Sequence, residues 1–174
     1  MSDPRNVIDT YKYWKHEAII ADLDVKRHNF GVLCCNIQGD FNLGTIVRNA
    51  NAFLSQEVII YGRKKFDRRG AVGTYKYTHF RHVRETEELD ETLSGYDLIV
   101  GVDNVDRAIP LENFEWPKDK KTLMCFGEEG GGLPYEVIDK CHKIVYIKQY
   151  GSVRSLNVGC ASSIAMFHYC TQLK

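Results

Sequence analysis

Two stretches of this chain combine amide, glycine and charged residues in the way that sites for cofactors and anions do. The first, NIQGDFNLGTIVRNANAF over residues 36–53, places an amide-rich loop, a glycine and Arg48 at the head of a predicted helix. The second, residues 123–158, contains the glycine-rich acidic loop FGEEGGGL and closes with GSVRSLNV. Backbone that can approach a ligand closely, with one guanidinium and a few small polar side chains, indicates a site for a cofactor and a polyanion.

The first stretch has the glycines of a phosphate-binding P-loop but lacks its lysine. In GDFNLGT, residues 39–45, Thr45 stands where a P-loop lysine would neutralise the phosphates, so nucleoside triphosphate hydrolysis is not indicated. If the helix begins near Leu43, Asn42 occupies the N-cap, where free backbone N–H groups attract an anion, and Arg48 lies in the second turn. The alternative is an ordinary N-cap asparagine beside a surface arginine.

The second stretch places its glycines directly after an apolar strand. Four of the six residues 127–132 are glycine, so the backbone there must turn sharply or come close to a ligand. The loop lacks GxGxxG, which excludes the dinucleotide-binding fingerprint. Ligands of open α/β sheets bind beyond the carboxyl ends of the strands, so we expect Gly127 and residues 148–157 on one rim. A flexible surface loop is the alternative.

The segment of residues 63–84, RKKFDRRGAVGTYKYTHFRHVR, is rich in cations and holds a single carboxylate, Asp67. We call residues 63–84 the basic segment; the acidic run ETEELDE follows it directly. Because the net charge of the chain is zero, only this local pattern favours a phosphate-contacting patch. Two oppositely charged, solvated faces are the alternative. The aromatic residues that could stack on bases are Phe66, Tyr75, Tyr77 and Phe80.

Composition is that of an ordinary globular protein, with 44% hydrophobic and 26% charged residues in a chain of 174. No apolar run approaches the roughly 20 residues that cross a bilayer, and no secretory signal core opens the chain. The six cysteines show no CxxC pair, so we expect reduced, buried thiols, no metal and a cytoplasmic location. His79, His82 and His168 have no serine or cysteine at a recognisable spacing, so a nucleophilic triad is not indicated.

Apolar runs alternate with helical patterns along the chain, which predicts a single α/β domain with a mainly parallel sheet and helices on both faces. Residues 1–29 are predicted as a helical extension, and residues 30–174 as the domain. The predicted strands are 30–36, 58–61, 80–83, 98–102, 122–126 and 144–147. The predicted helices are 43–54, 87–93, 135–140 and 156–173. The last helix is small or apolar nearly all round, which suits either a subunit interface or the core.

Three ordered motifs together resemble the TrmH (SpoU) branch of the SPOUT superfamily of RNA methyltransferases, over residues 30–173. The family pattern of an asparagine and then N-x-G-x-x-x-R-x-A is matched by Asn36 and NLGTIVRNA at 42–50. Its F-G-N-E-x-x-G-L is matched by FGEEGGGL at 126–133 except at one position. Its I-P-M-x-G-x-x-x-S-L-N-V is matched at Ile147, Gly151 and the SLNV of 155–158.

The resemblance implies S-adenosyl-L-methionine-dependent methyl transfer to a ribose 2′-hydroxyl of RNA, either tRNA or rRNA. It also implies a C-terminal trefoil knot and a homodimer formed through the knot region. The catalytic residues it implies are Arg48, Asn42, Ser155, Asn157 and Glu129. The cofactor-binding residues it implies are Val102, Gly127, Ile147, Ser155 and Leu156. The RNA-binding residues are Arg48 and, in the basic segment, Arg63, Lys64, Lys65, Arg68 and Arg69.

The chain departs from the family pattern at two places. Glu128 replaces the usual asparagine of the second motif, which adds a negative charge beside the cofactor loop. Lys148 and Gln149 replace the usual Pro-Met of the third, which makes that loop more polar. These departures leave two alternatives open: an RNA-binding relative without catalysis, and a methyltransferase that acts on an RNA base.

Overall fold

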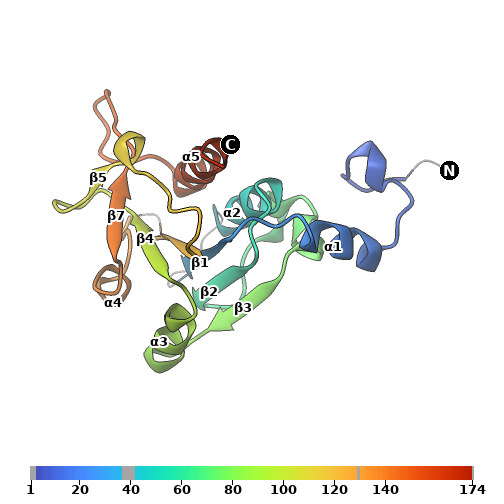
Figure 1. The fold of residues 1–174 in the computed structure, drawn as a ribbon, viewed down its shortest axis with the longest axis horizontal. Coiled ribbons are helices and arrows are strands. Elements are labelled where there is room, and N and C mark those ends of the chain that lie inside the picture. The colour runs from blue at the N-terminus through green and yellow to red at the C-terminus, as the bar shows by residue number, and fades with distance from the viewer. Residues whose placement is uncertain (1–2, 37–41, 129, 174) are drawn as a thin grey trace.

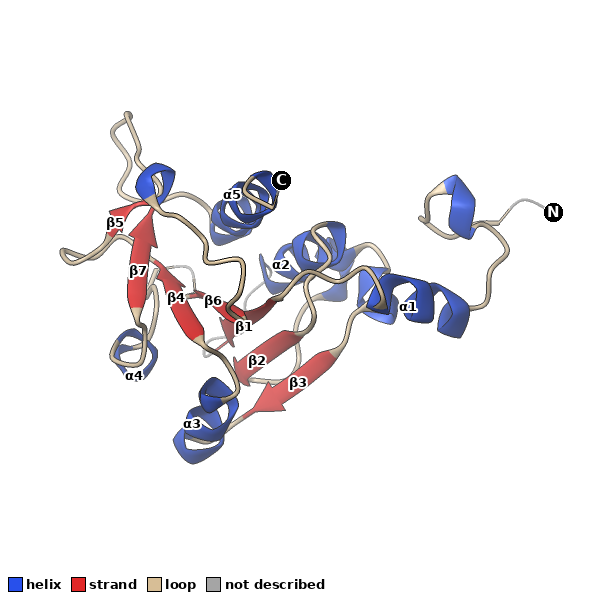
Figure 2. Ribbon diagram, in the orientation of Figure 1, coloured by secondary structure: helices blue, strands red, loops and turns tan. Residues whose placement is uncertain are grey.

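A computed structural model describes residues 3–36, 42–128 and 130–173. Its centre is a parallel sheet of seven strands in the order β3-β2-β1-β6-β4-β7-β5 (Figure 2). The strands are β1 (Phe30–Asn36), β2 (Val58–Gly62), β3 (Phe80–Val83), β4 (Leu98–Val102), β5 (Ile109–Pro110), β6 (Thr122–Phe126) and β7 (Lys143–Tyr146).

Strand β6 lies at the middle of the sheet, between β1 and β4. Thr122 is paired with Phe30 on one side and with Leu98 on the other. All residues of β6 are buried, as its continuous apolar sequence TLMCF predicts for a strand covered on both faces. Parallel pairing brings the carboxyl ends of β4, β6 and β7 to one edge of the sheet.

Helices cover both faces of this sheet (Figure 1). Residues of α2 and α5 share one buried cluster with the inner strands, and residues of α3 and α4 share the cluster on the opposite face. The helices are α1 (His16–Asp24), α2 (Asn42–Ala52), α3 (Thr86–Ser94), α4 (Tyr135–Ile138) and α5 (Val158–Thr171). None of them, over the residues described, is long and apolar enough to cross a membrane.

The predicted single α/β domain with a parallel sheet is confirmed, and the differences lie at element ends. Strand β7 begins one residue earlier than predicted and ends one residue earlier, and α5 begins at Val158, after the predicted start. Strand β5 was not predicted because it has two residues, one of them proline. Helix α2 begins at Asn42, so Asn42 is the first helical residue and the predicted N-cap role is wrong.

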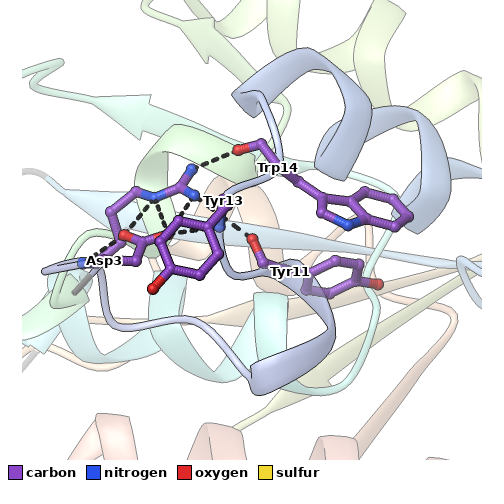
Figure 3. Close-up of polar contacts among 5 residues, drawn as sticks. Asp3, Tyr11, Tyr13 and Trp14 are labelled. Carbon is purple, nitrogen blue, oxygen red and sulfur yellow. Dashed lines mark hydrogen bonds and ion pairs between the residues drawn. The ribbon is translucent and has the colours of Figure 1, made fainter. Parts of the chain in front are cut away.

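The N-terminal extension is held to the domain through α1 and the residues that follow it, and its first residues form a compact turn bonded within itself (Figure 3). Tyr11, Ile19 and Tyr77 form a small buried cluster between the extension and the basic segment. Asp3 accepts hydrogen bonds from the Tyr13 backbone N–H at 2.8 Å and from the Arg5 guanidinium, and these bonds lower the pKa of Asp3. Arg5 also donates to the carbonyl of Trp14 at 2.8 Å.

The cysteines are free, and four of them are buried: Cys34, Cys35, Cys125 and Cys141. Burial raises the pKa of Cys35 and of Cys125 well above the usual value. Cys170 is half-buried and Cys160 is exposed on α5. The buried thiols therefore serve as small apolar side chains, as the sequence predicts.

Candidate active site

A cavity of about 820 Å³ opens beyond the carboxyl ends of β4, β6 and β7. Its walls come from residues at and after the ends of these strands, namely 102–104, 127–128, 130–132, 146–149, 151, 153–156 and 158, together with Ala161 of α5. All the residues predicted to bind the cofactor line it: Val102, Gly127, Ile147, Ser155 and Leu156. The sheet edge thus brings together side chains and backbone that lie more than 40 residues apart in the sequence.

The glycine-rich loop is a tight hairpin whose two ends touch. The backbones of Glu128 and Gly132 exchange hydrogen bonds of 3.2 and 3.0 Å. A Cβ atom on Gly127 would lie 2.0 Å from the carbonyl carbon of Gly132, so only glycine fits there. Asp103 fixes the residue that follows the loop, because its carboxylate accepts a 2.7 Å hydrogen bond from the Leu133 N–H. The loop therefore offers a preformed backbone wall rather than a flexible surface segment.

The segment after β7 forms the opposite wall and leads into α5. Asn104 donates from Nδ2 to the Arg154 carbonyl at 3.1 Å, which ties this wall to the end of β4. Asn157 caps α5, its side chain accepting from the Cys160 N–H at 3.2 Å. Gln149 also lines the cavity, and its Oε1 is buried without a hydrogen-bond partner among the described residues.

Helix α2 joins the cavity wall through α5. Asn157 donates from Nδ2 to Oδ1 of the buried Asn42 at 2.8 Å. Asn49 donates from Nδ2 to the Gly159 carbonyl at 2.8 Å and to Ser162 Oγ at 2.9 Å. A Cβ atom on Gly159 would lie 2.8 Å from the Thr45 methyl group, so the two helices cross at close range. The structure therefore brings Asn42 and Asn157 together and fixes α2 against the cavity.

Arg48 is placed apart from the cavity. Its side chain is exposed on α2, it is not among the cavity-lining residues, and within the described chain it has no hydrogen bond or ion pair. Glu129, the other charged residue predicted to be catalytic, lies outside the described residues. The chain alone thus joins Asn42, Ser155 and Asn157 to the cavity region but leaves Arg48 facing outward.

The basic segment begins where β2 ends and packs on the start of α2. A Cβ atom on Gly44 would lie 2.5 Å from the Asp67 carbonyl, and one on Gly70 would lie 3.0 Å from the Thr45 nitrogen. This contact sets the short helix η2 (Arg68–Ala71) directly beside the helix of Arg48. The predicted RNA-binding side chains are exposed: Arg63, Lys64, Lys65, Arg68 and Arg69.

The charges and rings of the basic segment are partly engaged within the chain. Arg69 is paired with Asp67 at 2.5 Å, and Arg68 lies over the Tyr75 ring at 4.9 Å. Tyr77 is buried, so its predicted role as a stacking surface is wrong. Phe66 and Phe80 lie ring to ring at 6.1 Å, and Phe80 keeps 41% of its surface exposed.

Sequence reasoning missed Asp103, Asn104 and Arg154 as parts of this site. Asp103 and Asn104 directly follow strand β4, so polar residues at the end of an apolar strand were the available signal. No cluster of three or more potential metal-ligating side chains is found in the described part of the chain.

The chain is similar in sequence to known RNA methyltransferases. The model of the SpoU rRNA Methylase family matches residues 29–167. A tRNA (guanosine(18)-2′-O)-methyltransferase of Saccharomyces cerevisiae is 33% identical over 79 residues, which are 45% of this chain and 5% of the yeast protein. A Staphylococcus aureus (strain COL) protein named for the TrmH family of tRNA/rRNA methyltransferases is 27% identical over 168 residues, 92% of this chain and 66% of that protein. This chain thus spans less than two-thirds of either relative.

Solved structures share the fold. A TrmH/SpoU tRNA modifying enzyme of A. aeolicus superposes with a TM-score of 0.77 at 21% identity, over 90% of this chain and 81% of that one. An AdoMet-bound rRNA methyltransferase of Sinorhizobium meliloti gives a TM-score of 0.75 at 21% identity, over 89% of this chain and 60% of that one.

Proposed function

The chain belongs to the SpoU rRNA methylase family, and from that premise we propose that it transfers a methyl group from S-adenosyl-L-methionine to a ribose 2′-hydroxyl of RNA. One observation carries the proposal: a single cavity collects every predicted cofactor-binding residue. The bond between Asn157 and Asn42 links that cavity to the helix of Arg48. The names of the relatives favour tRNA or rRNA as the substrate class.

The cavity suits S-adenosylmethionine in size and in the chemistry of its lining. Its volume of about 820 Å³ falls within the roughly 300–1,000 Å³ of small-molecule sites. The lining carries both signs of charge, with carboxylates at Asp103 and Glu128 and cations at Lys148 and Arg154, and the cofactor likewise carries cationic groups and a carboxylate. The backbone of Gly127 lines the cavity, and the backbone of Gly132 occupies the space that a side chain on Gly127 would need.

When bound, S-adenosylmethionine supplies an electrophilic methyl carbon on a sulfonium sulfur. The ribose 2′-oxygen must approach that carbon while it loses its proton. Asn42, Ser155 and Asn157 hold the ribose and its phosphate at the cavity mouth by hydrogen bonds. Arg48 stabilises the negative charge that develops on the 2′-oxygen. Because a guanidinium keeps its proton up to a pKa above about 12, a phosphate oxygen of the RNA or a water takes the hydroxyl proton.

Arg48 is exposed and does not line the cavity of its own chain, which supports a homodimer in which it serves the partner's cavity. Helix α5 presents an exposed apolar stripe for such an interface, with Ile164 39% and Phe167 60% exposed. Cys160 and Thr171 continue that stripe at helical spacing. We also propose the C-terminal trefoil knot that the family resemblance implies; in its support, the segments after β4, β6 and β7 line one cavity, and α5 packs on α2.

We assign residues 1–29 to an extension and residues 30–174 to the methyltransferase domain. The exposed cations of the basic segment lie beside α2 and would contact the RNA phosphates on either side of the target ribose.

The test is methyl transfer by the full chain and by its Arg48→Ala variant, with labelled S-adenosylmethionine and total RNA. Wild type is expected to label RNA at alkali-resistant linkages, since a 2′-O-methyl group blocks alkaline cleavage. Arg48→Ala is expected to lose about 100-fold in rate, because it removes the charge that stabilises the transition state. Its binding of S-adenosylhomocysteine, measured by calorimetry, should stay unchanged because the proposed contact of Arg48 is with the ribose 2′-oxygen and not with the cofactor.

Lys120→Ala is the matched control, because Lys120 is an exposed cation at the amino end of β6, on the opposite edge of the sheet. Its rate should equal that of wild type. Label in nucleobases rather than riboses would contradict the proposed target. Tight RNA binding with no label in any RNA would favour the alternative of a non-catalytic relative.

A further inference from the structure

Tyr150 lies in solvent on the loop that joins β7 to α5, residues 147–157, which we call the β7–α5 loop. With 87% of its surface exposed, Tyr150 is the most exposed large hydrophobic side chain in the described chain. Val153 at 66% and Leu156 at 37% are exposed on the same loop. Single exposed apolar side chains are common on protein surfaces, whereas several on one loop indicate contact with another molecule.

The β7–α5 loop also forms one wall of the cavity. It extends beyond the end of β7, away from the sheet, before the chain reaches α5 (Figure 1). Gln149 and Gly151, the two sequence neighbours of Tyr150, both line the cavity, whereas Tyr150 itself does not. Because its neighbours form the wall while its own side chain is almost fully exposed, Tyr150 lies at the rim of the cavity. A group bound to its ring would therefore sit beside the entrance rather than inside.

The charges next to Tyr150 are cationic. The Lys148 ammonium lies over the Tyr150 ring, 5.4 Å from its centroid, which is within the roughly 6 Å of a cation–π contact. Arg154 is exposed on the same loop, and the loop contains no carboxylate. The acidic residues of the cavity lining, Asp103 and Glu128, belong to the segments after β4 and β6. The exposed ring is thus placed beside two cations.

A nucleobase fits these features better than a protein side chain does. Stacking of a base on an aromatic ring needs an open ring and tolerates any base, because every base has a π-face. The phosphate that accompanies each base is attracted by cations, and the β7–α5 loop carries cations without a carboxylate. A base that stacks on a protein ring must first be unstacked from its neighbours. Bases of this kind occur in the loops, bulges and single strands of RNA but not within a duplex.

We propose that Tyr150 stacks on an unpaired base of the RNA substrate next to the target ribose and makes the enzyme select RNA that is single-stranded at this position. This rests on the proposed function, because it takes RNA as the substrate. Tyr150 acts here as a specificity-determining residue that holds the RNA at the rim of the cavity. Lys148 and Arg154 attract the phosphates on either side of the stacked base.

Fluorescence anisotropy on the full chain, saturated with S-adenosylhomocysteine, tests this with a labelled single-stranded RNA of mixed sequence and with the same strand annealed to its complement. Tyr150→Ala should bind the single strand about tenfold more weakly than wild type does, and its affinity for the duplex should not change. The slope of log affinity against log salt should stay the same, because no charge is removed. Tyr150→Phe keeps the ring and should retain the wild-type affinity for the single strand.

Tyr135→Ala is the matched control, because Tyr135 is 78% exposed on α4, outside the β7–α5 loop, and this variant should bind both RNAs as wild type does. Calorimetry with S-adenosylhomocysteine should give the same affinity for Tyr150→Ala as for wild type, since the proposed contact is with RNA. A loss of cofactor binding would place Tyr150 in the cavity wall instead and overturn the inference.

The remaining outcomes separate this inference from the function on which it rests. If Tyr150→Ala binds the single strand as tightly as wild type does, the role of Tyr150 is overturned, while methyl transfer by wild type to total RNA still stands. An equal loss for single strand and duplex would overturn base stacking. If sedimentation shows that Tyr150→Ala has lost a subunit contact that wild type makes, a second copy of the chain is the occupant. If wild type binds neither RNA, the proposed function and the inference fail together.

Discussion

The walls of the cavity and the basic segment are held in different ways. Around the cavity, backbone touches backbone: the ends of the 127–132 loop exchange hydrogen bonds, and Asp103 fixes Leu133. In the basic segment, backbone contacts at Gly44 and Gly70 fix only its base on α2, and its cations extend from the surface. The first region is held by backbone contacts within the chain, whereas the second presents exposed cations, some of which are engaged within the chain. Cofactor binding should therefore depend on steric fit, and RNA binding on charge and salt.

The largest expected effect comes from adding one carbon to the preformed wall. Gly127→Ala would place a Cβ atom 2.0 Å from the Gly132 carbonyl carbon, so the loop must shift. We expect S-adenosylhomocysteine binding to weaken by about 100-fold, since misplacement by about 1 Å costs a site that much. Calorimetry measures the binding. Gly95→Ala is the control, because Gly95 does not line the cavity and its added Cβ would meet only the Thr92 carbonyl oxygen, at 3.4 Å. Normal binding by a folded Gly127→Ala protein would contradict a rigid wall.

A smaller effect is expected when charge is removed from the basic segment. The double variant Lys64→Ala/Lys65→Ala should bind RNA about tenfold more weakly at low salt, and the slope of log affinity against log salt should fall by about 1 to 2. Cofactor binding should not change. Fluorescence anisotropy with labelled RNA at several salt concentrations measures both quantities.

Lys118→Ala/Lys120→Ala removes the same charge at the opposite edge of the sheet and controls for net charge. If both double variants lost the same amount of RNA affinity, the basic segment would not be a specific RNA contact.

The smallest effect is expected where α5 meets α2, at the bond between Asn157 and Asn42, and it concerns stability rather than binding. Asn157→Ala removes the cap of α5 and the bond to Asn42, and should lower the free energy of unfolding by about 1–2 kcal/mol. Asn157→Asp keeps the capping acceptor but cannot donate to Asn42. The free energy of unfolding measured in urea should therefore be highest for wild type, lower for Asn157→Asp and lowest for Asn157→Ala. If Asp and Ala were equally unstable, the Asn42 bond rather than the cap would hold the junction.

The sequence predicts the cavity well because continuous apolar runs identify strands buried on both faces. Once β4, β6 and β7 are recognised as parallel, their carboxyl ends must meet, which places Gly127 and residues 148–157 on one rim. Val102 and Ile147 were predicted only from the resemblance to the family. The same reasoning could not find β5, whose pairing with β7 depends on tertiary contacts of a two-residue segment. It also could not find the unpaired oxygen of Gln149, because hydrogen-bond satisfaction is a property of the packed structure.

Predictions for the basic segment succeeded for charge and failed in part for aromatic residues. Charged side chains stay exposed because their burial is costly, so the exposure of Lys64 and Lys65 follows from residue type alone. An aromatic ring suits the core and the surface equally well. Tyr77 is buried against Tyr11 and Ile19 of the extension, a partner that the local pattern of the basic segment does not reveal.

The central place of β6 also bears on how the chain folds as the ribosome releases it. Strand β6 separates β1 from β4 in the sheet, although β4 precedes it in the sequence. Until Phe126 has emerged, β1 and β4 each expose an unpaired inner edge, and apolar strand edges of this kind favour misassociation. Insertion of β6 closes both edges in one event between distant segments, which is slow for topological reasons. Nascent chains that stop before residue 122 are therefore the species that most need a chaperone.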